Sequence, residues 1–370
     1  MNSETRPYLM YGAPVSYYSG KLRSYLLHKR IPFEEKAVNA WHFLWLIPRR
    51  VKTSVIPVLK TPNGEWLQDT SVMMDELEKR FPEPPVNPAN PVQRLVSYLF
   101  ELWGDEFWLP LGMHTRWNRP EHIPWYAETQ VGPMMLPGWP KFLQRFIGYK
   151  TAGDMSGFVD KLGFGPDMAP VLDRFGEIQL DGLNAHFAEH KFLLGDRPCM
   201  GDFGLIGPLY GHIGRDPLSS RDLIDTRPHL KAWIQRMFDP ATSAGGKFPA
   251  DERIPETLMP ALRSIFDEML PFISACADAV RETPVVPADS KQVQRFMGTV
   301  SYPMAGGLHE RKAAGYPVWM TQRLLDVYRS MLATEQQQLE DWLHAVDGEA
   351  LLQLNLPQMQ RSALAAVRVA

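Results

Sequence analysis

This sequence has only two cysteines, no long apolar run and little net charge. Each of these features excludes a class of protein. The two cysteines among its 370 residues, Cys199 and Cys276, fit neither a disulfide framework nor the paired spacing of a zinc site. No apolar run reaches the roughly 18 residues of a membrane-spanning helix, and the first residues lack the pattern of a signal peptide. We therefore expect a reduced, cytoplasmic protein without a metal and without a membrane partner.

The charge balance narrows the set of partners further. Lysine and arginine together number 39, against 42 aspartate and glutamate residues, which gives a formal charge of −3 at pH 7. Because such a balance does not attract phosphate backbones, we expect no nucleic-acid partner. The chain is rich in proline, with 33 residues, and is long enough for two or three domains.

The most informative stretch runs from Val55 to Arg80, VIPVLKTPNGEWLQDTSVMMDELEKR. Its pattern predicts a short apolar strand, a turn, a second strand, and a helix that begins at the polar step Asp69 to Ser71. A proline inside a strand cannot donate to the ladder, so Pro57 belongs at an edge, a strand start or a bend, where a cis bond is tolerated. A cis Pro57 would leave the backbone of Ile56 facing outward, free to pair with an extended ligand.

The preceding residues complete a recognisable order of elements. Apolar spacing predicts a strand at Tyr8 to Tyr11, a helix from about Tyr18, a strand at Phe33 to Val38 and an irregular helical segment at Trp41 to Pro48. With the stretch above, the order is β-α-β-α-β-β-α, which matches a thioredoxin-like fold through about Phe81.

These residues resemble the glutathione S-transferase superfamily, of the cytosolic type. In that family a strand with a cis proline precedes an acidic residue and a hydroxyl residue at the next helix start, and here these are Ile56 to Leu59 and Asp69-Thr70. The resemblance implies that Ile56 and Pro57 bind the cysteinyl part of glutathione, and that Asp69 with Thr70 holds its γ-glutamyl end. A helix N-terminus favours a carboxylate in any case. The alternative is that Asp69 or Thr70 only caps the helix.

The segment Ser16 to Arg23, SYYSGKLR, resembles the catalytic segment of the same family. Ser16 falls where serine-type and cysteine-type members carry the residue that activates the glutathione thiol. Because a thiol has a pKa near 8.5, a hydroxyl that donates to the thiolate at a helix N-terminus would favour the charged form. Tyr17 is the strongest rival for this role, and the alternative for Ser16 is an ordinary helix cap.

The remainder of the chain predicts helices and a second resemblance. A proline-rich connector at residues 81–90 precedes a long amphipathic helix from Val92. The aromatic residues of 114–165 are candidates for the wall of a substrate pocket, and equally for a core or an oligomer contact. At Gly195 to Asp202 the sequence resembles the start of the buried helix in the family's second domain, with Asp202 in a structural role and Cys199 in place of the usual hydroxyl residue.

We therefore predict an α/β plus all-α protein. Residues 1–84 form a thioredoxin-like glutathione-binding domain, 91–240 an all-helical glutathione-transferase-like domain on the substrate side, and 256–370 an all-helical carboxy-terminal extension that serves packing, a pocket lid or partner docking. The resemblance implies a homodimeric glutathione transferase for detoxification, in which glutathione is a co-substrate and attacks a hydrophobic, electrophilic small molecule. Two alternatives are a non-catalytic glutathione-binding or interaction protein and a glutathione-dependent disulfide or peroxide reductase.

Overall fold

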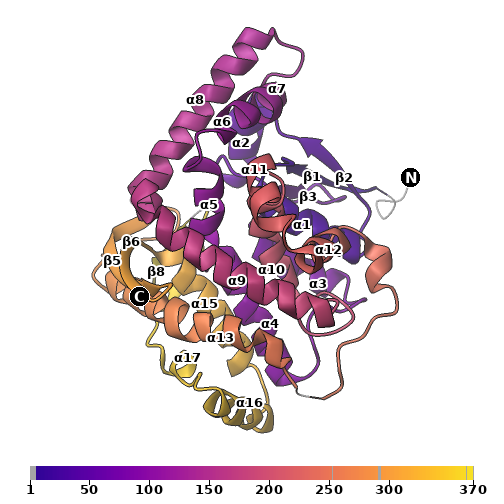
Figure 1. The fold of residues 1–370 in the computed structure, drawn as a ribbon, viewed down its shortest axis with the longest axis vertical. Helices are drawn as coiled ribbons and strands as arrows, with labels where there is room; N and C mark the ends of the chain where they lie inside the picture. The colour runs from indigo at the N-terminus through magenta and orange to yellow at the C-terminus, as the bar shows by residue number, and fades with distance from the viewer. Residues whose placement is uncertain (1–5, 252, 291–292, 364, 370) are drawn as a thin grey trace. The chain divides into compact units, whose positions relative to one another are not determined.

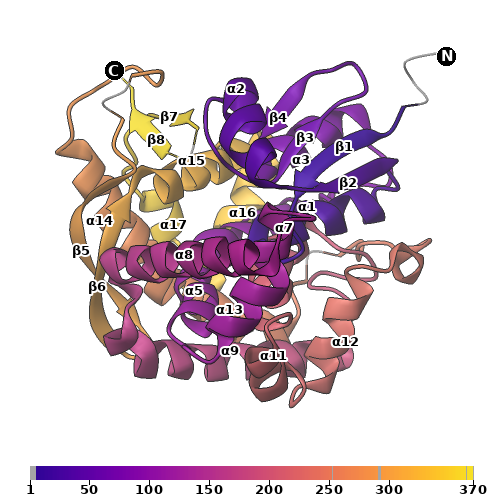
Figure 2. The same cartoon turned by 90° about the horizontal axis from the view of Figure 1, so that it is seen from above.

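The computed structural model describes residues 6–251, 253–290, 293–363 and 365–369 (Figures 1 and 2). They form two compact units, each assembled from three segments of the chain. Unit 1 comprises the chain up to Val86 together with Leu109–Ala169 and Leu205–Gly245. Unit 2 comprises Asn87–Trp108, Pro170–Gly204 and the chain from Gly246 onward. None of the helices in the described ranges is long and apolar enough to cross a membrane.

Residues 6–80 confirm the thioredoxin-like prediction. Four strands form one sheet in the order β2-β1-β3-β4, with β1 and β2 parallel and the other pairs antiparallel. The strands are β1 (Tyr8–Gly12), β2 (Phe33–Ala37), β3 (Val58–Lys60) and β4 (Trp66–Gln68), and the helices are α1 (Tyr17–His28), α2 (Ile47–Val51) and α3 (Thr70–Arg80). Tyr11 and Val58 are buried with Val38 and Ile47, because alternate strand residues face one side of a sheet.

Helices make up the rest of unit 1. They are α5 (Leu109–Trp117), α6 (His122–Trp125), α7 (Gly132–Met135), α8 (Lys141–Val159), α11 (Pro217–Ser219) and α12 (Pro228–Arg236). The last residues of α10 (Met200–Pro208) also belong to this unit. The longest of these helices, α8, packs against α7 and α5.

Unit 2 is built around helices and two hairpins. Its helices are α4 (Pro91–Leu102), α9 (Ala169–Glu189), the first residues of α10, α13 (Met259–Ser264), α14 (Leu270–Arg281), α15 (Gly315–Arg329), α16 (Ala333–Ala345) and α17 (Ala350–Gln353). Only Ala169 of α9 is assigned to unit 1. Asp202 has the structural role that the sequence predicts. Its carboxylate accepts hydrogen bonds from the backbone N–H groups of Leu193 (3.1 Å) and Cys199 (2.9 Å), which ties the start of α10 to the preceding loop.

The prediction of an all-helical extension was wrong. Two antiparallel hairpins, β5 (Phe296–Met304) with β6 (Gly307–Ala314) and β7 (Met359–Ser362) with β8 (Ala365–Arg368), lie among its helices. Ala305 (φ 51°) and Gly306 (φ 82°) form the β5–β6 turn, and two successive residues with positive φ match the twist of a two-residue hairpin. The buried residues of β5 include Met297, Tyr302 and Met304. These side chains are therefore buried from a paired strand and not from the helix that we expected.

A buried histidine in unit 2 makes the stability of the fold depend on pH. His186 on α9 stacks against His190 with 4.7 Å between ring centroids, and its Nδ1 lies 2.8 Å from Thr257 Oγ1. Burial, with a smaller effect from His190, lowers the pKa of His186 to about 3. Within the described residues no three histidine, cysteine or acidic side chains come together as a metal site.

We expect this histidine to destabilise the folded state in acid. The unfolded chain takes up a proton at His186 below a pH of about 6.5, whereas the folded chain does not until about pH 3, so stability falls by up to about 1.4 kcal/mol per pH unit in that interval. In urea unfolding from pH 7 to pH 4, His186→Gln should lose stability less steeply than the wild type. Equal slopes for the two proteins would contradict this assignment.

Candidate functional site

The predicted site residues of the first domain lie at one end of the sheet. At this end Tyr11 of β1 pairs with Val58 of β3, and Val58 pairs with Gln68 of β4. Just beyond these residues, β1 continues into the loop toward Ser16, β3 is entered from Ile56, and β4 continues into Asp69. The sheet therefore brings together residues that are separated by more than 50 positions in the sequence.

Ser16 is the N-cap of α1. Its Oγ accepts a hydrogen bond from the backbone N–H of Ser19 at 3.3 Å, and Ser16 itself is half-buried. A hydroxyl that accepts in this way still has its own hydrogen to donate. The first turn of α1 contains no acidic residue, so the positive end of the helix dipole is not neutralised there. Capping and donation to a thiolate are therefore compatible roles for Ser16.

Tyr17, the rival of Ser16, is packed into the helices of unit 1. It is 3% exposed, and its ring meets that of His212 edge to face with 5.8 Å between centroids. A Cβ atom at Gly207 or at Gly211 would lie 2.7 Å from an atom of Tyr17, so only glycine permits this approach. Burial of this kind favours a packing role for Tyr17.

The predicted glutathione-binding residues lie at the beginnings of two elements, with Ile56 and Pro57 just before β3 and Asp69 and Thr70 at the start of α3. The Ile56–Pro57 peptide bond is cis, Pro57 is buried and Ile56 is half-buried. Asp69 is the N-cap of α3, where its Oδ1 accepts from the backbone N–H of Val72 at 3.1 Å. It has a φ of 83°, which is uncommon for a non-glycine residue and is found mostly where surrounding structure enforces it. Thr70 is 6% exposed.

A pocket of about 390 Å³ opens beside the Ser16 loop. Its lining comes from the loop after β1, from the end of β2 and from the segment around α7, namely Pro14, Val15, Ala37, Asn39, Thr129, Gln130, Pro133, Met134 and Pro137. These nine residues are apolar or uncharged. The region 114–165 contributes five of these residues, Thr129, Gln130, Pro133, Met134 and Pro137, but none of its aromatic residues lines the pocket. Trp117 and Tyr126 are buried, and Phe142 and Phe146 are exposed.

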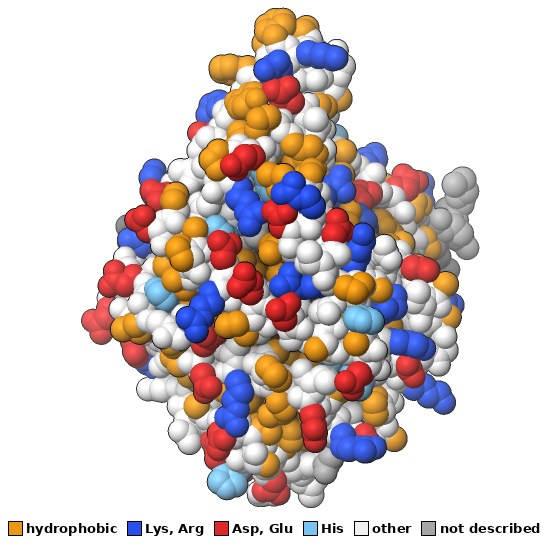
Figure 3. Space-filling model, viewed as in Figure 1, with side chains coloured by type: hydrophobic (Ala, Val, Ile, Leu, Met, Phe, Trp, Pro, Cys, Tyr) orange, Lys and Arg blue, Asp and Glu red, His pale blue; other side chains and the backbone are white. Residues whose placement is uncertain are grey.

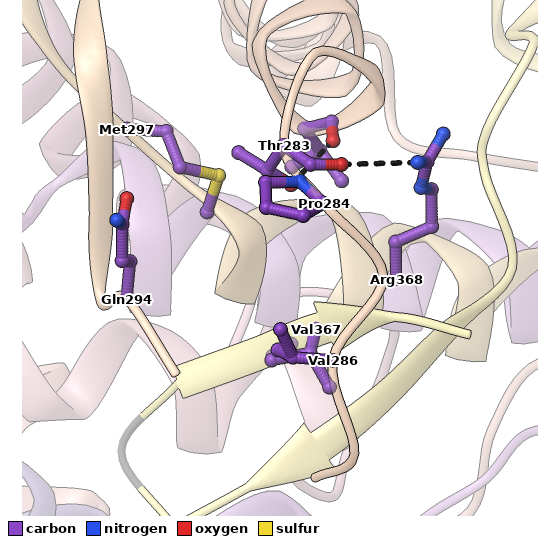
Figure 4. Close-up of a pocket in the computed structure, with 9 residues that line it drawn as sticks. Thr283, Pro284, Val286, Gln294, Met297, Val367 and Arg368 are labelled. Carbon is purple, nitrogen blue, oxygen red and sulfur yellow. Dashed lines mark hydrogen bonds between the residues drawn. The ribbon is translucent and has the colours of Figure 1, made fainter. Parts of the chain in front are cut away.

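A second pocket, in unit 2, is far smaller. It has a volume of about 40 Å³ and is lined by residues of α14, β5, β8 and the loops between them, including Thr283, Met297 and Arg368. Arg368 donates to the backbone oxygen of Thr283 at 3.0 Å (Figure 4). Such a volume holds water and not a drug-sized molecule, so this small pocket is not a candidate for a substrate site.

A buried ion pair, which the sequence does not reveal, fixes the loop before Ser16. Arg116 on α5 is 2% exposed and binds the carboxylate of Asp216 through two hydrogen bonds of 2.6 and 2.7 Å. The same guanidinium donates to the backbone oxygens of Val15 (2.9 Å) and Gly211 (2.6 Å). His122 lies 3.8 Å from this carboxylate, and burial is the main cause that lowers the pKa of His122. Arg116 therefore links α5 to the pocket-lining loop.

We expect Arg116→Met to destabilise the protein by about 3 to 5 kcal/mol, because it leaves the Asp216 carboxylate buried without its partner. The matched control is Arg119→Met, which removes a partly exposed ion pair to Asp222 (3.3 Å) and should cost less than about 1 kcal/mol. Urea unfolding of the two full-length variants measures both effects. Equal losses of stability in the two variants would show that the buried ion pair stabilises the protein no more than the exposed one.

Comparison with known proteins identifies one domain of the chain. Residues 10–85 match the family model of the glutathione S-transferase amino-terminal domain. Among curated proteins, no sequence matches the chain.

Several solved structures are similar at low identity. A glutathione S-transferase from Methylobacterium radiotolerans, in complex with glutathione sulfonate, is 18% identical, with a TM-score of 0.39 over 68% of this chain and 99% of that one. The β-etherase LigF from Sphingobium sp. is 18% identical, with a TM-score of 0.46 over 65% and 98%. The transferase GSTFuA3 from Phanerochaete chrysosporium is 15% identical, with a TM-score of 0.45 over 66% and 99%. Through residues 10–85, which the family model matches, the amino-terminal domain of this chain belongs to the glutathione S-transferase superfamily.

Proposed function

We propose that the protein is a glutathione transferase that activates the thiol of glutathione for attack on an uncharged, apolar electrophile. The observation that carries the proposal is the convergence of Ser16, Ile56 and Asp69 at one end of the sheet, beside a pocket of about 390 Å³. Such a pocket has the volume expected for a small organic substrate.

Glutathione fits this end of the sheet by its chemistry. Its γ-glutamyl end carries an ammonium group and a carboxylate, for which the Asp69 carboxylate and the N-terminus of α3 at Thr70 are complementary. Its peptide backbone is extended and would pair with the backbone of Ile56 before β3. In this binding mode the cysteinyl sulfur would lie near the N-terminus of α1.

Ser16 would then stabilise the thiolate. Its hydroxyl donates to the sulfur, and the N-terminal dipole of α1 favours the negative charge, so the thiol releases its proton to solvent more readily. The thiolate sulfur forms a bond to an electrophilic carbon of the second substrate, and the electron pair of the bond that breaks leaves with the departing group. The reacting nucleophile belongs to glutathione, so no residue of the protein is modified.

The pocket lining favours an uncharged second substrate. Pro14, Pro133 and Met134 offer apolar contacts, while Asn39 and Gln130 offer neutral hydrogen-bonding groups. A carboxylate or an ammonium group would lose its hydration there without a side chain of opposite charge among the nine described lining residues.

The burial of the two cysteines argues against any reductase chemistry that uses a protein thiol, so a glutathione-dependent disulfide or peroxide reductase would have to use the glutathione thiolate itself. Burial raises the pKa of Cys276 to about 11 and raises that of Cys199 well above its usual value. Both side chains are fully buried, so neither presents a thiolate to a substrate at neutral pH.

Substitution of Ser16 tests the catalytic role. Ser16→Gly removes the hydroxyl but keeps a residue that is tolerated as an N-cap, so we expect kcat/KM at pH 7 to fall on the order of 100-fold with little loss of stability. Ser16→Thr keeps a hydroxyl and should retain most of the activity. The rate of conjugation of a neutral aromatic electrophile is the measurement, and an unchanged rate in Ser16→Gly would remove this residue from the mechanism.

Substitution of Asp69 separates ligand binding from helix capping. Asparagine caps helices as well as aspartate and tolerates positive φ, so Asp69→Asn should keep the fold while it removes the charge that faces the ammonium group. Isothermal calorimetry with reduced glutathione at pH 7 should show a Kd about 10 to 100 times higher than that of the wild type. Glu76→Gln on the same helix is the control and should bind normally. Wild-type affinity in Asp69→Asn would limit Asp69 to a capping role.

A further inference from the structure

An exposed apolar ridge, formed by Trp41, Leu44 and Trp45, lies on the helical turn His42–Leu46 that runs directly into α2. Trp41 is 53% exposed, Leu44 69% and Trp45 45%. Their spacing of three and four residues puts the side chains on one side of the helix, and the two indole rings stack with 5.0 Å between centroids. Such a group differs from the single apolar residues that any protein surface carries, and it indicates an interaction site.

The opposite side of the same helical segment belongs to the core of unit 1. Ile47 is fully buried, and Phe43 and Leu46 pack against the cluster that contains Tyr11 and Val58. The segment is therefore apolar on both sides, although its outer side is exposed. Figure 2 shows α2 at the periphery of unit 1, beside β4. A helix that is apolar all round is normally buried all round, so the ridge is a surface suited to an apolar environment outside the protein.

The residues around the ridge carry charge of one sign. Between Glu35 and Glu65 the sequence has no acidic residue but five basic ones, Lys36, Arg49, Arg50, Lys52 and Lys60. Arg49, Arg50 and Lys52 are exposed, and in the described part of the chain none of these three forms an ion pair. Acidic and basic side chains are interspersed on the face seen in Figure 3. The segment after β2 is therefore a local basic site in a chain whose net charge is slightly negative.

One of these basic side chains is held against the ridge. Cζ of Arg49 lies 4.1 Å from the ring centroid of Trp45, and Nη1 of Arg49 donates to the backbone oxygen of Trp45 at 3.0 Å. Trp41, Trp45 and Arg49 therefore follow one another at intervals of four residues, with apolar surface at one end and charge at the other. Tryptophan and leucine beside basic residues are typical of helical segments that lie in the interface of a bilayer.

We propose that the ridge docks unit 1 on a bilayer that contains anionic lipids. Its three side chains insert among the head groups, while Arg49 and Arg50 bind lipid phosphates. A protein partner fits less well, because the exposed parts of the ridge amount to on the order of 350 Å², against the roughly 800 Å² that each partner contributes to a standard interface. This proposal replaces the expectation of no membrane partner, which rested on the lack of a membrane-spanning run and not on the local charge.

The ridge lies next to the pocket beside Ser16. Asn39 lines that pocket and accepts a hydrogen bond from the backbone N–H of His42 at 2.9 Å, and the His42 ring lies 5.4 Å from the Trp41 ring between centroids. Because an uncharged, apolar electrophile concentrates in a bilayer, docking through the ridge gives the pocket access to it there. This consequence rests on the proposed function, whereas lipid binding itself does not.

Co-sedimentation of the full-length protein with lipid vesicles tests the docking. At about 50 mM salt the protein should bind phosphatidylcholine vesicles that contain about 30% phosphatidylglycerol, and about 0.5 M salt should release it. Leu44→Ser and Arg50→Gln should each lower the partition coefficient roughly fivefold. The matched controls are Leu308→Ser, at a similarly exposed apolar residue of unit 2, and Lys79→Gln, at an exposed basic residue of α3, and neither should change binding.

Two kinds of result would overturn the proposal. The first is no vesicle binding by the wild type, or binding that Leu44→Ser and Arg50→Gln leave unchanged although urea unfolding shows both variants to be folded. The second is self-association that Leu44→Ser abolishes, because the ridge would then be a protein contact. The measurement needs neither glutathione nor an electrophile, so its failure leaves the proposed transferase untouched. Vesicle binding by a protein without transferase activity would separate the two in the opposite direction.

Discussion

The geometry of the candidate site depends on the guanidinium of Arg116. It is buried, forms two hydrogen bonds with the Asp216 carboxylate and donates to the backbone oxygens of Val15 and Gly211. Val15 lines the pocket and directly precedes the N-cap of α1, so the position of Ser16 relative to the pocket follows from this contact. A buried charge held from several sides adds rigidity only while every partner is present.

Helix capping and the proposed glutathione binding use the same side chains, Ser16 and Asp69. Each residue accepts a hydrogen bond from the backbone of its own helix, and each lies where the helix dipole favours negative charge. The serine hydroxyl keeps a hydrogen to donate, whereas the aspartate keeps a negative charge that can face an ammonium group. A capping motif in a sequence is therefore compatible with a binding site.

Local patterns predicted the first domain because its determinants are close in sequence. The helix start at Asp69 depends on neighbouring residues and was predicted correctly, and the Ile56–Pro57 bond is cis, as the resemblance implies. The pair Arg116–Asp216 joins residues 100 positions apart, and no periodicity indicates such a contact. The β5–β6 hairpin was missed because its turn places a non-glycine residue, Ala305, at positive φ, which composition does not signal.

The pKa of the glutathione thiol in the bound state tests the central claim most directly. Ultraviolet titration of the wild-type complex follows thiolate formation without any second substrate and so reports on the site alone. The account predicts a pKa well below the usual value of about 8.5, near or below 7, and a return toward 8.5 in Ser16→Gly. Bound glutathione that titrates like the free peptide would contradict activation by Ser16 and the N-terminus of α1.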